Sequence, residues 1–155
     1  MHTLFGDSKD VTPATSRAGG QAAIATILTC DGVKSEDTGT SVINEVWQRY
    51  SPDIAGGIAG TSWQQLGAAL QGYGIPYNWY TGFAGLKHAL SLHKPCIIML
   101  DVGAIPEEGW HSWGGHWVVA YAYDNQDIYL NNWHGAANKY EDGGKCTNAT
   151  FLQAW

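Results

Sequence analysis

Charged residues are scarce in this sequence, and no run of basic residues occurs. Lys, Arg, Asp and Glu make up 14% of the 155 residues, and the formal net charge at pH 7 is −6. Because proteins that bind nucleic acid or anionic membranes carry clustered Lys and Arg, we expect neither as a partner. Also missing are an apolar run near the ~20 residues of a membrane span and a signal peptide in the opening residues. We therefore expect a soluble protein, and the sequence specifies no localisation.

Cysteine is also rare, and the usual metal and phosphate motifs are absent. Cys30, Cys96 and Cys146 stand far apart without a C-x-x-C pair, which disfavours a zinc site and a disulfide framework and leaves open whether two of them pair. No glycine-rich phosphate loop and no His-Glu-x-x-His pattern occurs, so we expect no metal and no cofactor. Cys30 and Cys96 are predicted to be small core residues, whereas Cys146 lies in a polar segment and is predicted to be exposed.

The length is that of one domain, which we expect to span residues 1–155 with an irregular lead-in over residues 1–14. Apolar spacing predicts four helices in the first half. The first begins near Ser16 or Arg17 and ends near Cys30, the second covers residues 40–50, and the fourth covers residues 82–93. The third is expected to have Thr61 as its cap, with Gln64 completing a capping box, and Gly74 as its end.

The second half is richer in apolar and β-branched segments, which predict strands. Expected strands lie at 75–80, 94–102, 115–124, 127–133 and 138–142. Because helices come first and strands second, without strand–helix alternation, the pattern predicts an α+β fold with an antiparallel sheet.

The first helix is expected to be buried, since nearly all of its sides are small or apolar: Ala22, Ala23, Ile24, Ile27 and Leu28. Two glycines, Gly19 and Gly20, stand just inside its start. Glycine destabilises a helix interior, so their presence predicts that another part of the molecule approaches closely there.

A histidine and two asparagines are the best candidates for chemistry. His116 opens the strand at 115–124, and Asn131 and Asn132 close the next one. A hairpin turning at residues 124–126 brings the start of one strand beside the end of the other. A carboxamide that accepts a hydrogen bond from the imidazole fixes its tautomer, so that it serves as a general base and acid. The matching nucleophile position is the N-terminus of the buried helix, where backbone N–H groups lower a thiol pKa.

Three stretches resemble the papain-like cysteine peptidases, most closely the bacterial branch similar to the double-glycine leader peptidases: "AGGQAA" at 18–23, "GHWVVAYAYD" at 115–124 and "IYLNNW" at 128–133. In that family Cys-Gly-x-x-Ala begins the central helix, Gly-His opens a strand, and Asn or Asp ends the next strand. The resemblance covers roughly residues 16–133. It implies a papain-like fold, in which a central buried helix packs on an antiparallel sheet.

The resemblance also implies roles for individual residues. Ala18 occupies the nucleophile position, His116 matches the base, and Asn132 matches the orienting residue, with Asn131 as the fallback. Two departures stand out. Alanine cannot attack a carbonyl, and Thr12 stands where the family usually carries a glutamine of the oxyanion hole.

The alanine has two explanations, an engineered replacement of cysteine or a natural pseudo-peptidase that binds a peptide or protein without cleaving it. We favour the first, because the rest of the site persists around the missing thiol. The expected function is that of a cysteine peptidase, inactive as given, in a bacterial effector or toxin module. A protein deamidase, a transglutaminase and a cell-wall amidase use similar machinery and remain alternatives.

Substrate contacts are expected next to the catalytic positions. Gly19 and Gly115 flank the nucleophile and the base, and the aromatic segment at 106–117, which includes His116, contains Trp110, Trp113 and Trp117. Such aromatic side chains form an apolar wall or lid over a substrate, or they simply pack the loop on the sheet. The expected partner is a peptide or protein substrate, and a host target and an immunity protein are further candidate partners.

Overall fold

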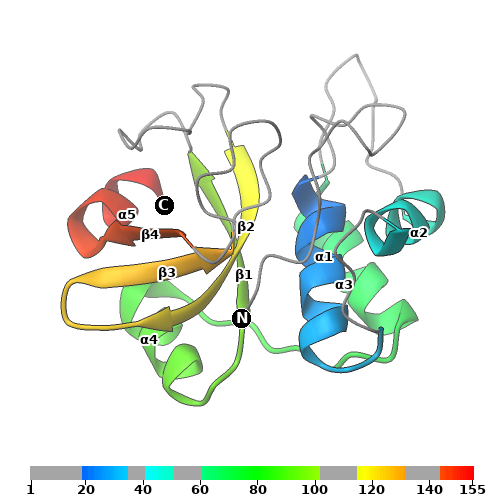
Figure 1. Ribbon diagram of the computed structural model, residues 1–155. Coiled ribbons are helices and arrows are strands. Elements are labelled where there is room, and N and C mark those ends of the chain that lie inside the picture. The colour runs from blue at the N-terminus through cyan, green and yellow to red at the C-terminus, as the bar shows by residue number, and fades with distance from the viewer. Residues whose placement is uncertain (1–18, 35–40, 51–60, 102–114, 132–143) are drawn as a thin grey trace. The chain divides into compact units, whose positions relative to one another are not determined.

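Helices occupy the first part of the chain and an antiparallel sheet the second, in the computed structural model drawn in Figure 1. The structure describes residues 19–34, 41–50, 61–101, 115–131 and 144–155. The elements are α1 (Gly19–Cys30), α2 (Ser41–Arg49), α3 (Trp63–Gly72), α4 (Gly82–Ser91), β1 (Cys96–Asp101), β2 (Gly115–Tyr123), β3 (Asp127–Asn131), β4 (Gly144–Thr147) and α5 (Asn148–Ala154). The chain is therefore α+β, as predicted. It divides into two compact units, one that holds α1 to α3 and one that holds α4, the sheet and α5. The expectation of a single domain stays a prediction.

The helical unit is built around α1. Every residue from Gly20 to Leu28 is buried, which confirms the prediction of a buried helix. Both α2 and α3 pack against it. The buried faces of these two helices are apolar at helical spacing, with Val42, Ile43, Val46 and Trp47 on α2 and Leu66, Ala69 and Leu70 on α3.

The start of α3 differs from the prediction by one residue. Ser62, not Thr61, is the N-cap: its hydroxyl accepts a hydrogen bond from the Gln65 backbone N–H, and the Gln65 side chain accepts one from the Ser62 N–H. The capping box is thus Ser62 with Gln65 instead of Thr61 with Gln64. Thr61 is buried, and its hydroxyl lies beside the side chain of Gln21. Both residues of the Thr61–Ser62 pair are good caps, so composition could not choose between them.

The strand predicted at 75–80 is wrong. Those residues form no helix or strand. Gly74 has a φ of +75°, which turns the chain back, and the backbone N–H of Ile75 donates to the Leu70 carbonyl at 2.9 Å. Ile75 is buried, so its apolar side chain serves the helical unit and not a sheet.

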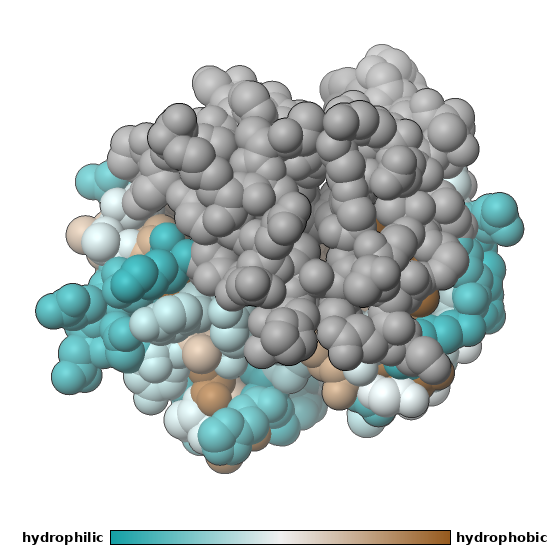
Figure 2. Space-filling view, in the orientation of Figure 1, coloured by the Kyte–Doolittle hydropathy of each residue, from teal (hydrophilic) through white to brown (hydrophobic). Residues whose placement is uncertain are grey.

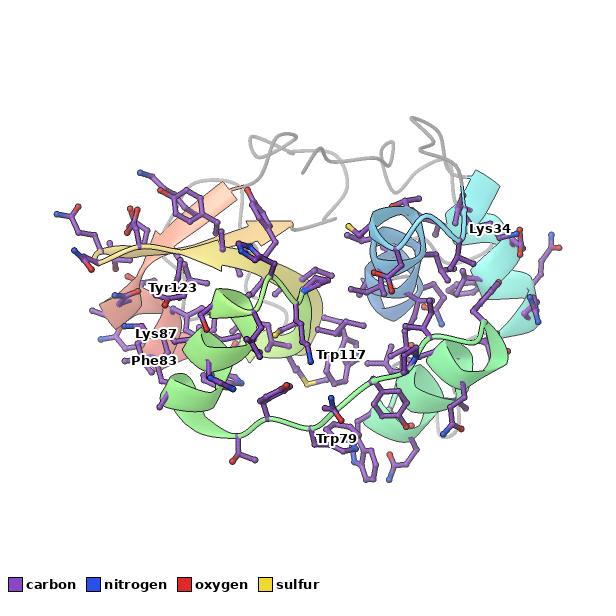
Figure 3. The ribbon with its side chains drawn as sticks, turned by 90° about the horizontal axis from the view of Figure 1, so that it is seen from below. Lys34, Trp79, Phe83, Lys87, Trp117 and Tyr123 are labelled. Atoms are coloured by element: carbon purple, nitrogen blue, oxygen red, sulfur yellow. The ribbon has the colours of Figure 1, made fainter. Side chains whose placement is uncertain are left out.

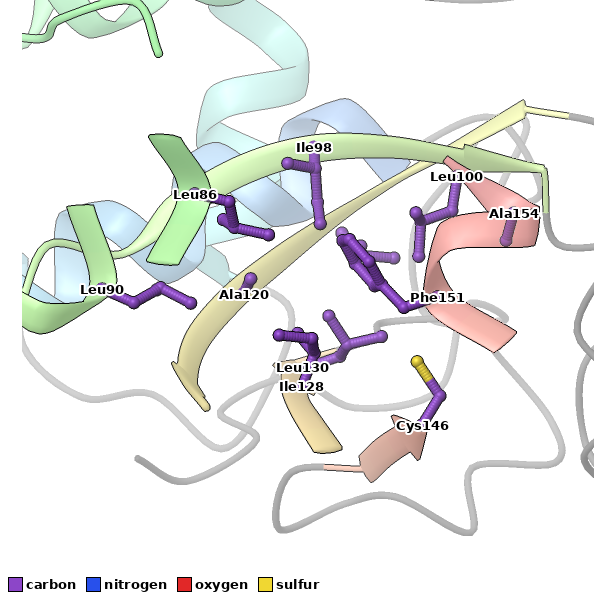
Figure 4. Packing of buried hydrophobic residues seen from close by; sticks show 11 residues of the cluster. Leu86, Leu90, Ile98, Leu100, Ala120, Ile128, Leu130, Cys146, Phe151 and Ala154 are labelled. Atoms are coloured by element: carbon purple, nitrogen blue, oxygen red, sulfur yellow. The ribbon is translucent and has the colours of Figure 1, made fainter. Parts of the chain in front are cut away.

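The four strands lie in the order β1-β2-β3-β4, and each neighbouring pair is antiparallel. Both α4 and α5 cover one face of this sheet (Figure 1). The core between these helices and the sheet consists of eleven residues, shown in Figure 4: Leu86, Leu90, Ile98, Leu100, Val118, Ala120, Ile128, Leu130, Cys146, Phe151 and Ala154. This face of the sheet uses alternate positions of each strand, as a half-buried antiparallel sheet requires.

The C-terminal strand and helix, β4 and α5, are absent from the sequence prediction. The predicted strand at 138–142 lies outside the described residues. In β4 the exposed Lys145 and Thr147 flank the buried Cys146, which is only 2% accessible. The expectation of an exposed Cys146 is therefore wrong, because its polar neighbours belong to the outer face of a strand. Cys30 is exposed and Cys96 is half-buried, so the cysteines predicted to be core residues are more exposed than Cys146, which was predicted to be exposed. None of the three is in a disulfide.

The hairpin between β2 and β3 turns at residues 124–126, as predicted. Asp124 organises the turn: its Oδ1 accepts hydrogen bonds from the backbone N–H groups of Gln126 at 2.8 Å and Asp127 at 2.7 Å. Figure 2 shows hydrophilic side chains over this hairpin end, at the left of the view, where residues 124–126 are exposed. The β2–β3 register shifts between Ala120 and Ala122. The strand β2 alternates only in part in the sequence because Val118, Val119 and Ala120 are all buried.

Aromatic and cationic side chains add contacts between α4 and the sheet. The Lys87 Nζ lies 4.7 Å from the centroid of the Phe83 ring and 5.6 Å from that of Tyr123 (Figure 3). Phe83 belongs to α4 itself, whereas the contact with Tyr123 joins α4 to β2 and supplements their apolar packing. No helix in the described part of the chain is long and apolar enough to cross a membrane.

Candidate functional site

The base position and the orienting position lie on adjacent strands. His116 is the second residue of β2 and is paired with Leu100 of β1, and Asn131 is the last residue of β3 and is paired with Val119 of β2. Asn131 is therefore opposite a residue three positions beyond His116, about 10 Å along the strand at roughly 3.3 Å per residue. The start of β2 and the end of β3 share one end of the sheet, but His116 and Asn131 are not direct cross-strand partners.

The remaining predicted catalytic residues flank described elements. Ala18 lies outside the described residues and is bonded to Gly19, the partly buried first residue of α1. Asn132 also lies outside them and follows Asn131. Gly115 is the first residue of β2 and is paired with Asp101. Residue 18 thus adjoins a helix of one unit, whereas His116 belongs to the sheet of the other.

Of the three predicted wall tryptophans, the structure describes Trp117. It is partly buried in β2 and is paired with Met99 of β1, which is 42% exposed (Figure 3). Cross-strand partners share a face of the sheet, so Trp117 and Met99 together form apolar surface. They alternate with Leu100 and Val118, which belong to the core under α4 and α5. Trp110 and Trp113 lie outside the described residues.

The first turn of α1 contains a polar contact that sequence reasoning missed. Gln21 is 1% accessible, and its Nε2 donates to the Tyr50 carbonyl at 2.6 Å and to the Thr61 hydroxyl at 3.3 Å. A glutamine within an otherwise small and apolar helix segment was the available signal, since buried amides are nearly always hydrogen-bonded. The neighbouring Gly20 touches Thr61 so closely that an added Cβ would lie 2.7 Å from the Thr61 Cβ. The predicted close approach at the glycine pair is therefore found at Gly20.

Cys30 and Cys96 lack the environment of an activated thiol. Loss of hydration around its sulfur raises the pKa of Cys30, although the residue as a whole is exposed, and the nearby Asp31 raises it further. Desolvation likewise raises the pKa of Cys96. A catalytic thiol needs the opposite shift, because the thiolate is the nucleophile. Neither residue therefore has the lowered pKa expected of a catalytic thiol.

The described residues form no site that could bind a metal ion. No group of three or more His, Cys, Asp or Glu side chains there is arranged to hold a metal ion. Several carboxylates are instead engaged with neighbours, such as Asp127, whose Oδ2 lies 3.3 Å from the Lys145 Nζ.

Comparisons with known proteins identify no family for this chain. No protein-family model matches the chain, and neither the curated proteins nor the solved structures include a significant match. The functional argument therefore depends on the residues and the geometry described above.

Proposed function

We propose that this chain is a papain-like cysteine peptidase domain whose nucleophile position carries alanine. The proposal depends mainly on one observation, the antiparallel pairing of β2 with β3 about the turn at 124–126. This pairing gives the start of β2, which contains His116, and the end of β3, at Asn131, a common end of the sheet. A buried helix that begins directly after residue 18 is the second support, since it suits a nucleophile at a helix N-terminus.

The chemistry would be acyl transfer through a thiol at position 18. His116 removes the proton of the thiol, and the thiolate attacks an amide carbonyl carbon. The tetrahedral intermediate collapses to a thioester as His116 returns the proton to the leaving amine. Water then attacks the thioester, releasing a carboxylic acid and restoring the thiol. Backbone N–H groups in the first turn of α1 would stabilise both the thiolate and the oxyanion.

The strand register bears on the choice between the two asparagines. Position 131 is opposite Val119, and 116 and 119 are separated by an odd number of residues. Because alternate positions of a strand serve opposite faces of a sheet, the register argues against Asn131 as the partner of His116. We therefore retain Asn132 as the orienting residue.

The direct test restores the thiol. The Ala18→Cys protein is treated with iodoacetamide near neutral pH, and labelling at each cysteine is followed by peptide mass spectrometry. Labelling at position 18 should exceed that at Cys30 and Cys96, whose pKa values are raised. Adding His116→Ala should abolish the excess. If residue 18 reacts no faster than Cys30, and no peptide in a mixed library is cleaved, the peptidase assignment is wrong.

The alanine in the sequence supports a second candidate, a pseudo-peptidase that binds a peptide or protein. It predicts that the unmodified chain binds a ligand while the Ala18→Cys protein shows no turnover. Deamidation, transamidation and cell-wall amide hydrolysis are separated from peptide cleavage by the masses of the products. A role as a bacterial effector or toxin stays a prediction.

A further inference from the structure

Gln21 is a buried polar residue at the start of a helix that is otherwise small and apolar. Burying an amide without hydrogen bonds is unfavourable, so its partners indicate what the residue does. Both hydrogens of its amide are used, one on the Tyr50 carbonyl at 2.6 Å and one on the Thr61 hydroxyl at 3.3 Å. The Thr61 Oγ1 also lies 3.5 Å from the Gln21 Oε1, to which it donates. Gln21 therefore joins the first turn of α1 to two distant segments of the chain.

The other buried polar side chain of α1 has a different kind of partner. The Thr26 hydroxyl donates to the Ala22 carbonyl of the same helix at 2.9 Å. Such a bond satisfies the hydroxyl without attaching the helix to anything else. By contrast, the partners of Gln21 are 29 and 40 residues away in the sequence. The Gln21 hydrogen bonds therefore restrain the position of the helix start.

Thr61 contacts the residue before Gln21 as well. A Cβ at Gly20 would lie 2.7 Å from the Thr61 Cβ and 2.8 Å from its Oγ1, so only glycine fits there. A cavity of about 10 Å³ is bordered by Gly20, Gln21, Tyr50 and Thr61, which is roughly the space of one water molecule. Thr61 therefore meets two successive residues of the first turn with little free space around them.

We propose that Gln21 and Thr61 are positioning residues of the peptidase site. By holding the first turn of α1, they fix the backbone that leads into residue 18, three positions before Gln21. They act through the backbone and do not touch the substrate. This inference rests on the proposed function, because the purpose it assigns to the restrained first turn is to position a nucleophile at residue 18. Displacement of a reacting group by about 1 Å lowers a rate by as much as ~100-fold, so such a restraint has a measurable effect.

The test uses the Ala18→Cys protein as parent and compares three further substitutions. Thr61→Val removes the hydroxyl at nearly constant volume, and Gln21→Met removes the amide. The control is Thr26→Val, which removes a buried hydroxyl from α1, the helix that contains Gln21. Two properties are measured: the rate of iodoacetamide alkylation at residue 18 as a function of pH, and backbone hydrogen exchange in the first turn of α1.

We expect Thr61→Val and Gln21→Met to slow alkylation about tenfold near neutral pH, to move its pH midpoint upward and to speed exchange in the first turn. Thr26→Val should leave the midpoint unchanged even if it lowers stability similarly. Thr61→Ser keeps the hydroxyl and should retain the parent midpoint. If the Val and Met variants do not fold, Thr61→Ser still decides, because a midpoint shift in that protein would contradict the proposal.

The outcomes separate this inference from the proposed function. If the parent cleaves no peptide but the midpoint moves with Thr61→Val and not with Thr26→Val, the peptidase assignment fails and the positioning role stands. If the parent cleaves peptides and Thr61→Val behaves like Thr26→Val, the positioning role is wrong and the peptidase assignment stands.

Discussion

Gly20 and Thr61 are in direct contact in the helical unit, where the space that a Cβ of residue 20 would need is already filled by the Thr61 side chain. The contact explains why a helix that is otherwise well suited to burial contains a glycine in its first turn. Glycine lowers helix stability there by about 1 kcal/mol relative to alanine, and the close packing of Thr61 offsets that loss.

Gly20→Ala should therefore destabilise the protein. The added methyl group overpacks against a β-branched side chain, at a cost of about 1–3 kcal/mol that exceeds the gain in helix propensity. The control is Gly85→Ala in α4, where the new Cβ would meet the Tyr80 Cβ at an ordinary 3.6 Å. That variant should be stabilised by about 0.5–1 kcal/mol. Urea unfolding of both proteins measures the difference, and equal effects would contradict the reported contact.

Phe151→Ala should be among the most destabilising single changes in the sheet unit. Phe151 is fully buried, and its ring centroid lies 6.0 Å from that of Phe83 and 5.4 Å from that of Trp155. Truncating a buried phenylalanine costs about 3–5 kcal/mol. Leu152, the next residue, is 49% exposed, so Leu152→Ala should change stability by less than about 0.5 kcal/mol. Thermal and urea unfolding of the two variants test this prediction. A small effect of Phe151→Ala would contradict the packing of α5 in the core.

Glu45→Gln should weaken the helical unit in a pH-dependent way. The carboxylate lies 2.8 Å from the Lys34 Nζ and accepts a hydrogen bond from the Tyr73 hydroxyl at 3.2 Å, and these contacts hold the pKa of Glu45 below its ordinary value. A lowered pKa stabilises the fold above the unfolded-state pKa, and this stabilisation is lost as the pH falls through the folded-state pKa. Because the groups are partly exposed, the difference at about pH 7 should be below about 1 kcal/mol.

The measurement for Glu45 is the free energy of unfolding of the chain as given and of its Glu45→Gln variant, at about pH 7 and about pH 3. The two proteins should converge in acid, and a difference that grows on acidification would refute the assignment. Tyr73→Phe serves as the matched variant, since it loses one hydrogen bond and keeps its ring beneath the Arg49 guanidinium, 4.4 Å away. It should be affected less than Glu45→Gln.

Asp124→Ala should loosen the hairpin of β2 and β3, which contains His116 and Asn131. Backbone hydrogen bonds from Gln126 and Asp127, together with one from the Tyr129 hydroxyl at 2.8 Å, lower the pKa of Asp124. Asp124→Asn keeps an acceptor oxygen and should retain most of the order. Hydrogen exchange along β2 and β3 is the measurement, with Asn125→Ala as control in the same exposed turn. Exchange that is unchanged in Asp124→Ala would show that the turn forms without this side chain.

Local sequence signals predicted much of the fold. The buried character of α1, the apolar faces of α2 and α3, and the turn at 124–126 follow from spacing and from residues with strong local preferences. Other features depended on contacts between distant residues. The helix start at Ser62 instead of Thr61 could not be read locally, because both residues are good caps and the Thr61 hydroxyl is engaged with Gln21, 40 residues away. The short strand β4 was hidden because a four-residue strand shows only one buried side chain, Cys146.

By itself, the sequence predicted the class of fold, which follows from the order and period of its apolar segments. The resemblance of three short stretches to papain-like peptidases supplied the candidate residues Ala18, His116 and Asn132, which stay predictions. Tertiary structure alone decided which residues Gln21 contacts, why Gly20 has to be glycine, and that Asn131 is paired with Val119. The physical reason is that burial, strand register and close packing are properties of pairs of residues far apart in the chain. The local structural preferences of the individual residues do not indicate which distant residues will pair.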